Sequence, residues 1–160
     1  MTVQQLLSNL PTKYKSIVER AYDFALRAHG NQKREGGDPY IVHPLAAAYF
    51  LSTLHLDGNT LAAALLHDVL EDTPVKQKDL EKEFGKEIAF LVDAVTKISA
   101  ITYKGKADIR QKQNLKAQTL RKMIFAMAKD LRVILIKLAD RYNNVQTLRG
   151  LSLERSHRIA

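Results

Sequence analysis

Cysteine is absent from the 160-residue sequence. A disulfide framework and a thiolate zinc site are therefore excluded, and any metal must be bound by histidine and carboxylate side chains. Apolar runs are also short. None approaches the ~20 residues of a membrane-spanning helix, and the N-terminus lacks the basic start and apolar core of a signal peptide. We expect a soluble protein of a reducing cytoplasm, with no membrane partner.

Strand patterns are scarce as well, and most of the chain has the apolar spacing of amphipathic helices. At this length one core is enough, so we expect a single all-α domain over residues 1–160. The run VILIKLAD could pass for a buried strand, but its Leu, Lys and Ala content favours a helix. The turn-rich segment 31–40 is a candidate binding loop, and segment 99–113 is expected to be a flexible insert. The expected helices span residues 14–29, 44–54, 61–72, 77–84, 86–98, 114–129 and 131–149.

The formal net charge of +8 is unevenly distributed. Residues 1–100 hold 11 Lys and Arg against 13 Asp and Glu, whereas residues 101–160 hold 14 against 4. The basic residues are not interleaved with exposed aromatic residues, which argues against a nucleic-acid partner. Two interpretations remain for the basic part: it steers a phosphorylated ligand, or it is a solvated face or docking surface.

Four polar side chains are crowded at the end of the expected helix 61–72: His67, Asp68, Glu71 and Asp72. On a continuous helix, His67 stacks over Glu71 and Asp68 over Asp72. Three carboxylates this close repel one another, and each is also unfavourable at the negative end of the helix dipole. A divalent metal is the simplest partner that offsets these charges. The alternative interpretation is a solvated, carboxylate-rich helix end.

Two more candidate ligands lie elsewhere in the chain. Asp140 follows the apolar run of the last expected helix, where a buried carboxylate is costly unless it is paired or bound to metal. An ordinary ion pair with Arg141 is the alternative. His43 precedes Pro44, a favoured first helical position, so it is expected just outside helix 44–54, where it could be no more than a helix-entry residue.

Four segments of the sequence resemble, in the same order, the hydrolase domain of the RelA/SpoT family, a branch of the HD-domain metal phosphohydrolases. The segments are KREGGDPYIVHP (33–44), LAAALLHDVLEDTP (61–74), FGKEIAFLVDAVTKIS (84–99) and LRKMIFAMAKDLRVILIKLADRYNNVQTL (120–148). The resemblance implies a compact multi-helix fold with a metal site in its helical core. It also implies manganese-dependent hydrolysis of guanosine 3′,5′-bispyrophosphate (ppGpp or pppGpp) to GDP or GTP and pyrophosphate, which switches off the stringent response.

The resemblance also implies roles for individual residues. Glu71 and Asp72 match the acidic pair that positions or deprotonates the attacking water, and Tyr40 is interpreted as a packing residue of the loop. The implied metal ligands are His43, His67, Asp68 and Asp140, and the implied substrate-binding residues are Arg34, Asn144 and Thr147.

The sequence departs from the family pattern at three positions. Glu35 replaces a second basic residue, Gly37 replaces a small hydroxyl residue, and Asn143 replaces a histidine, which puts in doubt a contact behind the metal ligands. The chain also stops where the family continues with another helix. We therefore expect either a small hydrolase with a short end or an N-terminal part of a bifunctional synthetase-hydrolase, without its synthetase domain. The alternatives are an HD phosphohydrolase acting on another nucleotide and a catalytically silent module that binds the alarmone.

Overall fold

The computed structural model describes residues 2–34, 36–103 and 130–148. Every regular element in these ranges is a helix, apart from an isolated β-bridge between Lys33 and Pro39, so the all-α expectation is confirmed. None of the described helices is both long and apolar enough to cross a membrane. The helices are α1 (Val3–Ser8), α2 (Thr12–His29), α3 (Val42–Thr53), α4 (Gly58–Leu66), α5 (Val69–Asp72), α6 (Gln77–Tyr103) and α8 (Arg132–Leu148).

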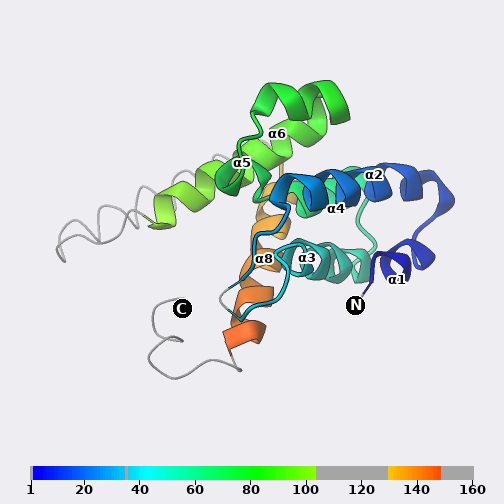
Figure 1. The fold of residues 1–160 in the computed structure, drawn as a ribbon. Helices are drawn as coiled ribbons and strands as arrows, with labels where there is room; N and C mark the ends of the chain where they lie inside the picture. The colour runs from blue at the N-terminus through cyan, green and yellow to red at the C-terminus, as the bar shows by residue number, and fades with distance from the viewer. Residues whose placement is uncertain (1, 35, 104–129, 149–160) are drawn as a thin grey trace.

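Helix α4 lies at the centre of the fold and contacts α2, α3, α6 and α8 (Figure 1). Its Ala- and Leu-rich sequence is apolar on all sides, as expected for a helix surrounded by others, and residues 60–66 are fully buried. Gly58 allows α4 to approach α2, because a Cβ atom at this position would lie 2.7 Å from Cδ1 of Tyr14. The C-terminal end of α4 therefore delivers the next residue, His67, into the core.

The expected continuous helix 61–72 is wrong, because the chain turns at His67 and Asp68 between α4 and α5. The side chain of His67 donates from Nδ1 to the carbonyl of Ala64 (2.8 Å), which is the acceptor that the amide of Asp68 would use in a continuous helix. The expected stop before Pro74 is confirmed: Thr73 is extended, as the residue before a proline should be.

Two other boundaries differ from the expectation. His43 lies inside the first turn of α3, not before it, because a proline is tolerated in a first turn, whose amides need no helical partner. The expected helices 77–84 and 86–98 are both present within α6, joined at Gly85 with φ 82° and ψ 169°. Residues 99–103 continue α6 and are not part of an insert. Residues 104–113 and the expected helix 114–129 lie outside the described residues.

Candidate metal centre and adjoining cavity

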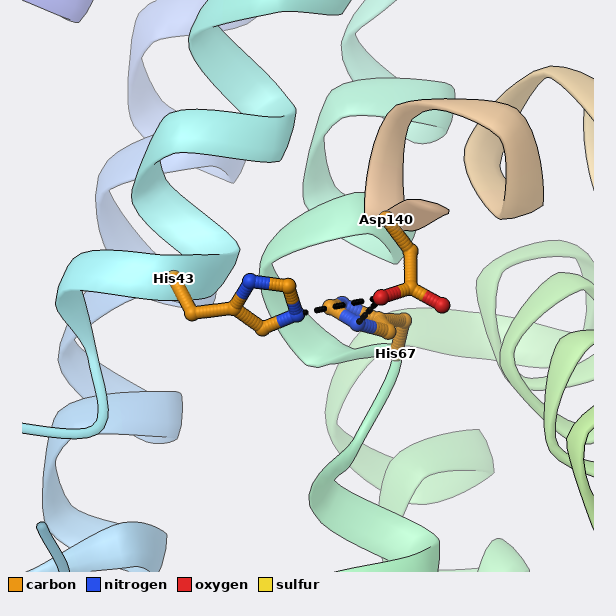
Figure 2. Close-up of side chains that lie close together, drawn as sticks. All are labelled: His43, His67 and Asp140. Carbon is orange, nitrogen blue, oxygen red and sulfur yellow. Dashed lines mark ion pairs between the residues drawn. The ribbon is translucent and has the colours of Figure 1, made fainter. Parts of the chain in front are cut away.

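Two imidazoles and two carboxylates meet in the core from three parts of the chain. His43 comes from the start of α3, His67 and Asp68 from the turn after α4, and Asp140 from α8. Figure 2 shows the side chains of His43, His67 and Asp140 directed toward one another; one ligand atom from each lies within 4.8 Å of the other two. Nε2 of His43 is 3.2 Å from Oδ1 of Asp140 and 3.6 Å from Oδ2 of Asp68. Nε2 of His67 is 3.1 Å from Oδ2 of Asp68 and 3.9 Å from Oδ1 of Asp140.

In both histidines, Nδ1, the ring nitrogen that points away from the carboxylates, makes a hydrogen bond that fixes the ring. Nδ1 of His43 lies 2.7 Å from Oδ1 of Asn143, an oxygen that also accepts from Arg34. Nδ1 of His67 donates to the carbonyl of Ala64. Both rings therefore present Nε2 to the carboxylates, which is the arrangement of metal-binding histidines. The replacement of a histidine by Asn143 put a contact to the implied metal ligands in doubt, but Asn143 makes this contact with Nδ1 of His43.

The charges in this cluster shift one another strongly. Burial alone would lower the pKa of His67, but the carboxylates of Asp68 and Asp140 raise it to about 9. Burial would raise the pKa of Asp68, yet the imidazole of His67 holds it well below its usual range. The pKa of Asp140 is likewise lowered against the effect of burial, by the hydrogen bond with His43 and the charges of His67 and Lys137. The carboxylates are thus kept ionised by the positive charge beside them.

Asp140 is held by Asn144 and by Lys137, and neither Lys137 nor its neighbour Ser99 was singled out from the sequence. The ammonium group of Lys137, a buried residue, lies 2.5 Å from Oδ2 of Asp140 and 2.7 Å from the hydroxyl of Ser99. Oδ1 of Asp140 accepts from the side-chain amide of Asn144 (2.7 Å). The available signal was a lysine inside an apolar run, three residues before Asp140 and therefore on the same side of the helix.

The acidic pair on α5 is more exposed and adjoins the cluster through Tyr40. The hydroxyl of Tyr40 lies 2.5 Å from Oδ2 of Asp72 and 2.9 Å from Oδ2 of Asp68. Burial and these carboxylates raise the pKa of Tyr40 above its usual value, so the phenol remains a hydrogen-bond donor. Burial, Asp68 and Asp72 also raise the pKa of Glu71. The interpretation of Tyr40 as a packing residue missed this contact with two carboxylates.

A cavity of about 270 Å³ opens beside the cluster. It is lined by every predicted site residue except His67, which is buried, and Thr147. Three cationic side chains, Arg34, Lys137 and Arg141, also line it, which suits an anionic ligand.

The predicted substrate-binding residues differ in their placement. Arg34 donates to Oδ1 of Asn144 (2.7 Å), so loop and helix α8 meet at the wall of the cavity. Thr147 is exposed, and its hydroxyl donates to the carbonyl of Asn144; a substrate contact by Thr147 stays a prediction. Gly37 adopts φ 89° in the turn that follows Arg34, whereas Glu35 lies outside the described residues.

Comparison with known proteins relates this arrangement to characterised relatives. A family model described as HD domain matches residues 21–160. The chain is 45% identical over 157 residues to the bifunctional (p)ppGpp synthase/hydrolase SpoT of Escherichia coli K12, covering 98% of this chain and 22% of that protein. It is 44% identical over 158 residues to a guanosine-3′,5′-bis(diphosphate) 3′-pyrophosphohydrolase of Aquifex aeolicus, covering 99% of this chain and 21% of the relative. It thus spans about a fifth of the length of these relatives.

Among solved structures, a match is found to a metazoan ortholog of SpoT that is described as hydrolysing ppGpp and acting in starvation responses. The TM-score is 0.66 and the sequence identity 28%, with 93% of this chain and 80% of the other chain covered.

Proposed function

The chain belongs to the HD-domain family, and from this membership we propose that it hydrolyses the 3′-pyrophosphate of ppGpp and pppGpp. The names of its relatives support the proposal: SpoT of E. coli is a (p)ppGpp hydrolase as well as a synthase, and the Aquifex protein is a 3′-pyrophosphohydrolase. We propose that residues 1–160 form a single hydrolase domain. Its role would be to end a stringent response in the cytoplasm.

The observation that carries the proposal is the environment of Nε2 of His67. This atom is buried and makes no well-formed hydrogen bond among the described residues, yet it lies 3.1 Å from a carboxylate oxygen of Asp68 and 3.9 Å from one of Asp140. A buried imidazole nitrogen that faces two carboxylate oxygens fits a shared metal ion, which all three groups can coordinate. Two imidazole nitrogens and two carboxylate oxygens suit manganese and similar divalent cations. We propose His43, His67, Asp68 and Asp140 as the ligands, and Mn²⁺ as the ion.

The acidic pair on α5 is proposed to handle the attacking water. A bound divalent ion would supply a lowered water pKa and offset the charge of the phosphates. Glu71 and Asp72 line the cavity, where their carboxylates can accept a proton from water, and Oδ2 of Asp72 also accepts from the hydroxyl of Tyr40. Since its pKa is raised, Glu71 is a better proton acceptor than an ordinary carboxylate.

The proposed reaction consumes one water molecule. The water oxygen bonds to the phosphorus attached to O3′, and the bond between that phosphorus and O3′ breaks. O3′ receives a proton and becomes the hydroxyl of GDP or GTP, and the two phosphates leave together as pyrophosphate. Arg34 and Asn144, at the wall of the cavity, are proposed to hold the nucleotide, with Thr147 as a further contact. A guanidinium group is suited to bidentate phosphate contacts and to stacking on a base.

Product analysis tests the proposal. The manganese-loaded protein is incubated with ppGpp, pppGpp and a panel of other nucleoside polyphosphates, and the products are separated by anion-exchange chromatography. We expect GDP or GTP and pyrophosphate in equal amounts from the two alarmones. Release of orthophosphate, or turnover of other nucleotides alone, would indicate an HD phosphohydrolase of different specificity. Binding of ppGpp without turnover would indicate a silent regulatory module.

A further inference from the structure

Helix α5 is too short to fix the position of its own acidic side chains. It has four residues, and a single helical turn is unstable by itself because helix nucleation is unfavourable. The amides of Glu71 and Asp72 donate to the carbonyl of Asp68, and the hydroxyl of Thr73 donates to the carbonyl of Val69. These bonds order the backbone of the turn but do not fix the carboxylate of Asp72, which depends on contacts from outside α5.

Tyr40 supplies the first of these contacts. Its single hydroxyl lies within hydrogen-bond distance of a carboxylate oxygen of both Asp68 and Asp72, and therefore joins the two acids. Two carboxylates this close repel each other, and a shared donor between them reduces the repulsion. The ring of Tyr40 is held in place by stacking on the buried ring of His29, with centroids 4.4 Å apart and planes 16° from parallel.

Gln32 supplies the second contact, on the backbone side of the same residue. Its side-chain amide donates to the carbonyl of Asp72 (2.8 Å), and its Oε1 lies 2.8 Å from Nδ1 of His29. The amide of Tyr40 donates in turn to the carbonyl of Gln32 (3.0 Å). Asp72 is therefore hydrogen-bonded at its carboxylate by Tyr40 and at its backbone carbonyl by Gln32. These two residues are also hydrogen-bonded to each other, and both contact His29.

We propose that Tyr40 and Gln32 are positioning residues that fix the carboxylate of Asp72 relative to Asp68, and thereby align the water-handling group with the metal ligands. The catalytic part of this inference rests on the proposed function. Neither residue needs to contact substrate for this role. It differs from packing, because it depends on the hydroxyl of Tyr40 and the amide of Gln32, not on the volume of the side chains.

The kinetic test uses variants that keep the volume and remove the hydrogen bond. Tyr40→Phe and Gln32→Met are each expected to lower kcat for ppGpp by about 10- to 100-fold, as for other groups that support a metal site from behind, with KM and bound manganese unchanged. In an Asp72→Asn background, Tyr40→Phe should cause little further loss, since the group it positions is already disabled. Tyr22→Phe, which changes a tyrosine that packs against the core and does not line the cavity, is the matched control.

Hydrogen exchange provides a readout that does not depend on turnover. In both variants the amides of Glu71 and Asp72 should exchange faster than in the wild type, while those of the central helix α4 are unchanged. If the wild type fails to hydrolyse ppGpp, the proposed function is refuted, and the exchange data still decide whether the two residues hold α5. Wild-type exchange and wild-type kcat in Tyr40→Phe, or a full additional loss on top of Asp72→Asn, would overturn the inference.

Discussion

The four acidic side chains around the cavity fall into two pairs with different surroundings. Those of Asp68 and Asp140 are 14% and 6% exposed and lie against imidazoles that keep them ionised. Those of Glu71 and Asp72 belong to exposed residues, and the pKa of Glu71 is raised. A metal ligand must be deprotonated, whereas a proton acceptor works best when its pKa is nearer to the working pH. The surroundings therefore favour metal binding for the first pair and proton transfer for the second.

If the two pairs have these different roles, substitutions at Asp68 and at Glu71 or Asp72 should affect metal binding differently, although the residues lie within one helical turn. Asp68→Ala should lose bound metal and activity together, because it removes a ligand. Glu71→Gln and Asp72→Asn should retain the metal and lose about 10²- to 10⁴-fold in kcat, the usual contribution of general acid–base catalysis. Metal content by mass spectrometry, measured on the samples used for kinetics, separates the two effects. An equal loss of metal in all three variants would contradict the division.

Substitution of Lys137 is expected to lower the free energy of unfolding by an amount that depends on whether metal is bound. Its ammonium group neutralises Asp140 inside the protein, so Lys137→Met leaves a buried carboxylate without this partner. Breaking such a buried pair typically costs about 3 to 5 kcal/mol. We expect a loss of this order in the metal-free protein and a clearly smaller loss with saturating manganese, because the ion takes over the neutralisation.

Urea unfolding in chelator and in excess manganese measures both values. The control is Lys97→Met, which breaks an exposed pair with Asp93 and should change the free energy of unfolding by less than about 1 kcal/mol in either condition. Identical losses for Lys137→Met with and without metal would show that Lys137 does not share the neutralisation of Asp140 with an ion.

At the scale of single elements, helix α4 is held at its N-terminus by Asp57. The carboxylate accepts from the amides of Asn59 and Thr60 and from the hydroxyl of Thr60, and it lies 3.6 Å from Nη1 of Arg132 on α8. Partial burial would raise the pKa of Asp57, but the hydrogen bonds with Thr60 and the charge of Arg132 lower it below 3.8. The cap thus joins the central helix to the helix that carries Asp140.

We expect Asp57→Ala to lower the free energy of unfolding by about 1 kcal/mol near neutral pH, and Asp57→Asn to cost less, because asparagine is an equally good N-cap. Folding lowers the pKa of Asp57, so its negative charge stabilises the folded protein at pH values above 3.8, the ordinary pKa of an aspartate. This stabilisation is lost as the pH falls through the lower pKa that Asp57 has in the folded protein. The difference between wild type and Asp57→Asn should therefore shrink with acidification. Denaturation over an acid pH series would contradict this if the difference grew.

Most of the described helices could be predicted from the sequence because their signals are local, but α1 (Val3–Ser8) was not expected, and α4 begins at Gly58, before the expected start at residue 61. Asp57 and Gly85 mark a beginning and a break, and apolar periodicity gives α2, α6 and α8 to within a few residues. The turn at His67 could not be predicted, because no glycine or proline marks it. It depends on where an imidazole finds its acceptor, which is a property of the folded chain.

The residues that lie together at the candidate site could be named where a family pattern marks them, whereas contacts that span the chain could not. Tyr40 was interpreted as packing because its partners, Asp68 and Asp72, lie about thirty residues away. Lys137 has no distinguishing motif, and its role is visible only once Asp140 and Ser99 are beside it.

At the scale of the whole molecule, the fold brings three distant segments to one point because α4 is buried on every side. The first turn of α3, the end of α4 and the middle of α8 meet in the core, and the cavity beside them is lined by both cationic residues and the acidic pair. The central claim is that this meeting point binds a divalent ion on which pyrophosphate release depends.

The most direct test is restoration of activity by metal. Protein stripped with a chelator is titrated with Mn²⁺, and bound manganese and pyrophosphate release from ppGpp are measured in the same samples. We predict no turnover in the stripped protein and a rate that rises in proportion to the manganese bound, with GDP and pyrophosphate in equal amounts. Pyrophosphate release that is independent of bound metal, or full metal binding without any release, would contradict the account.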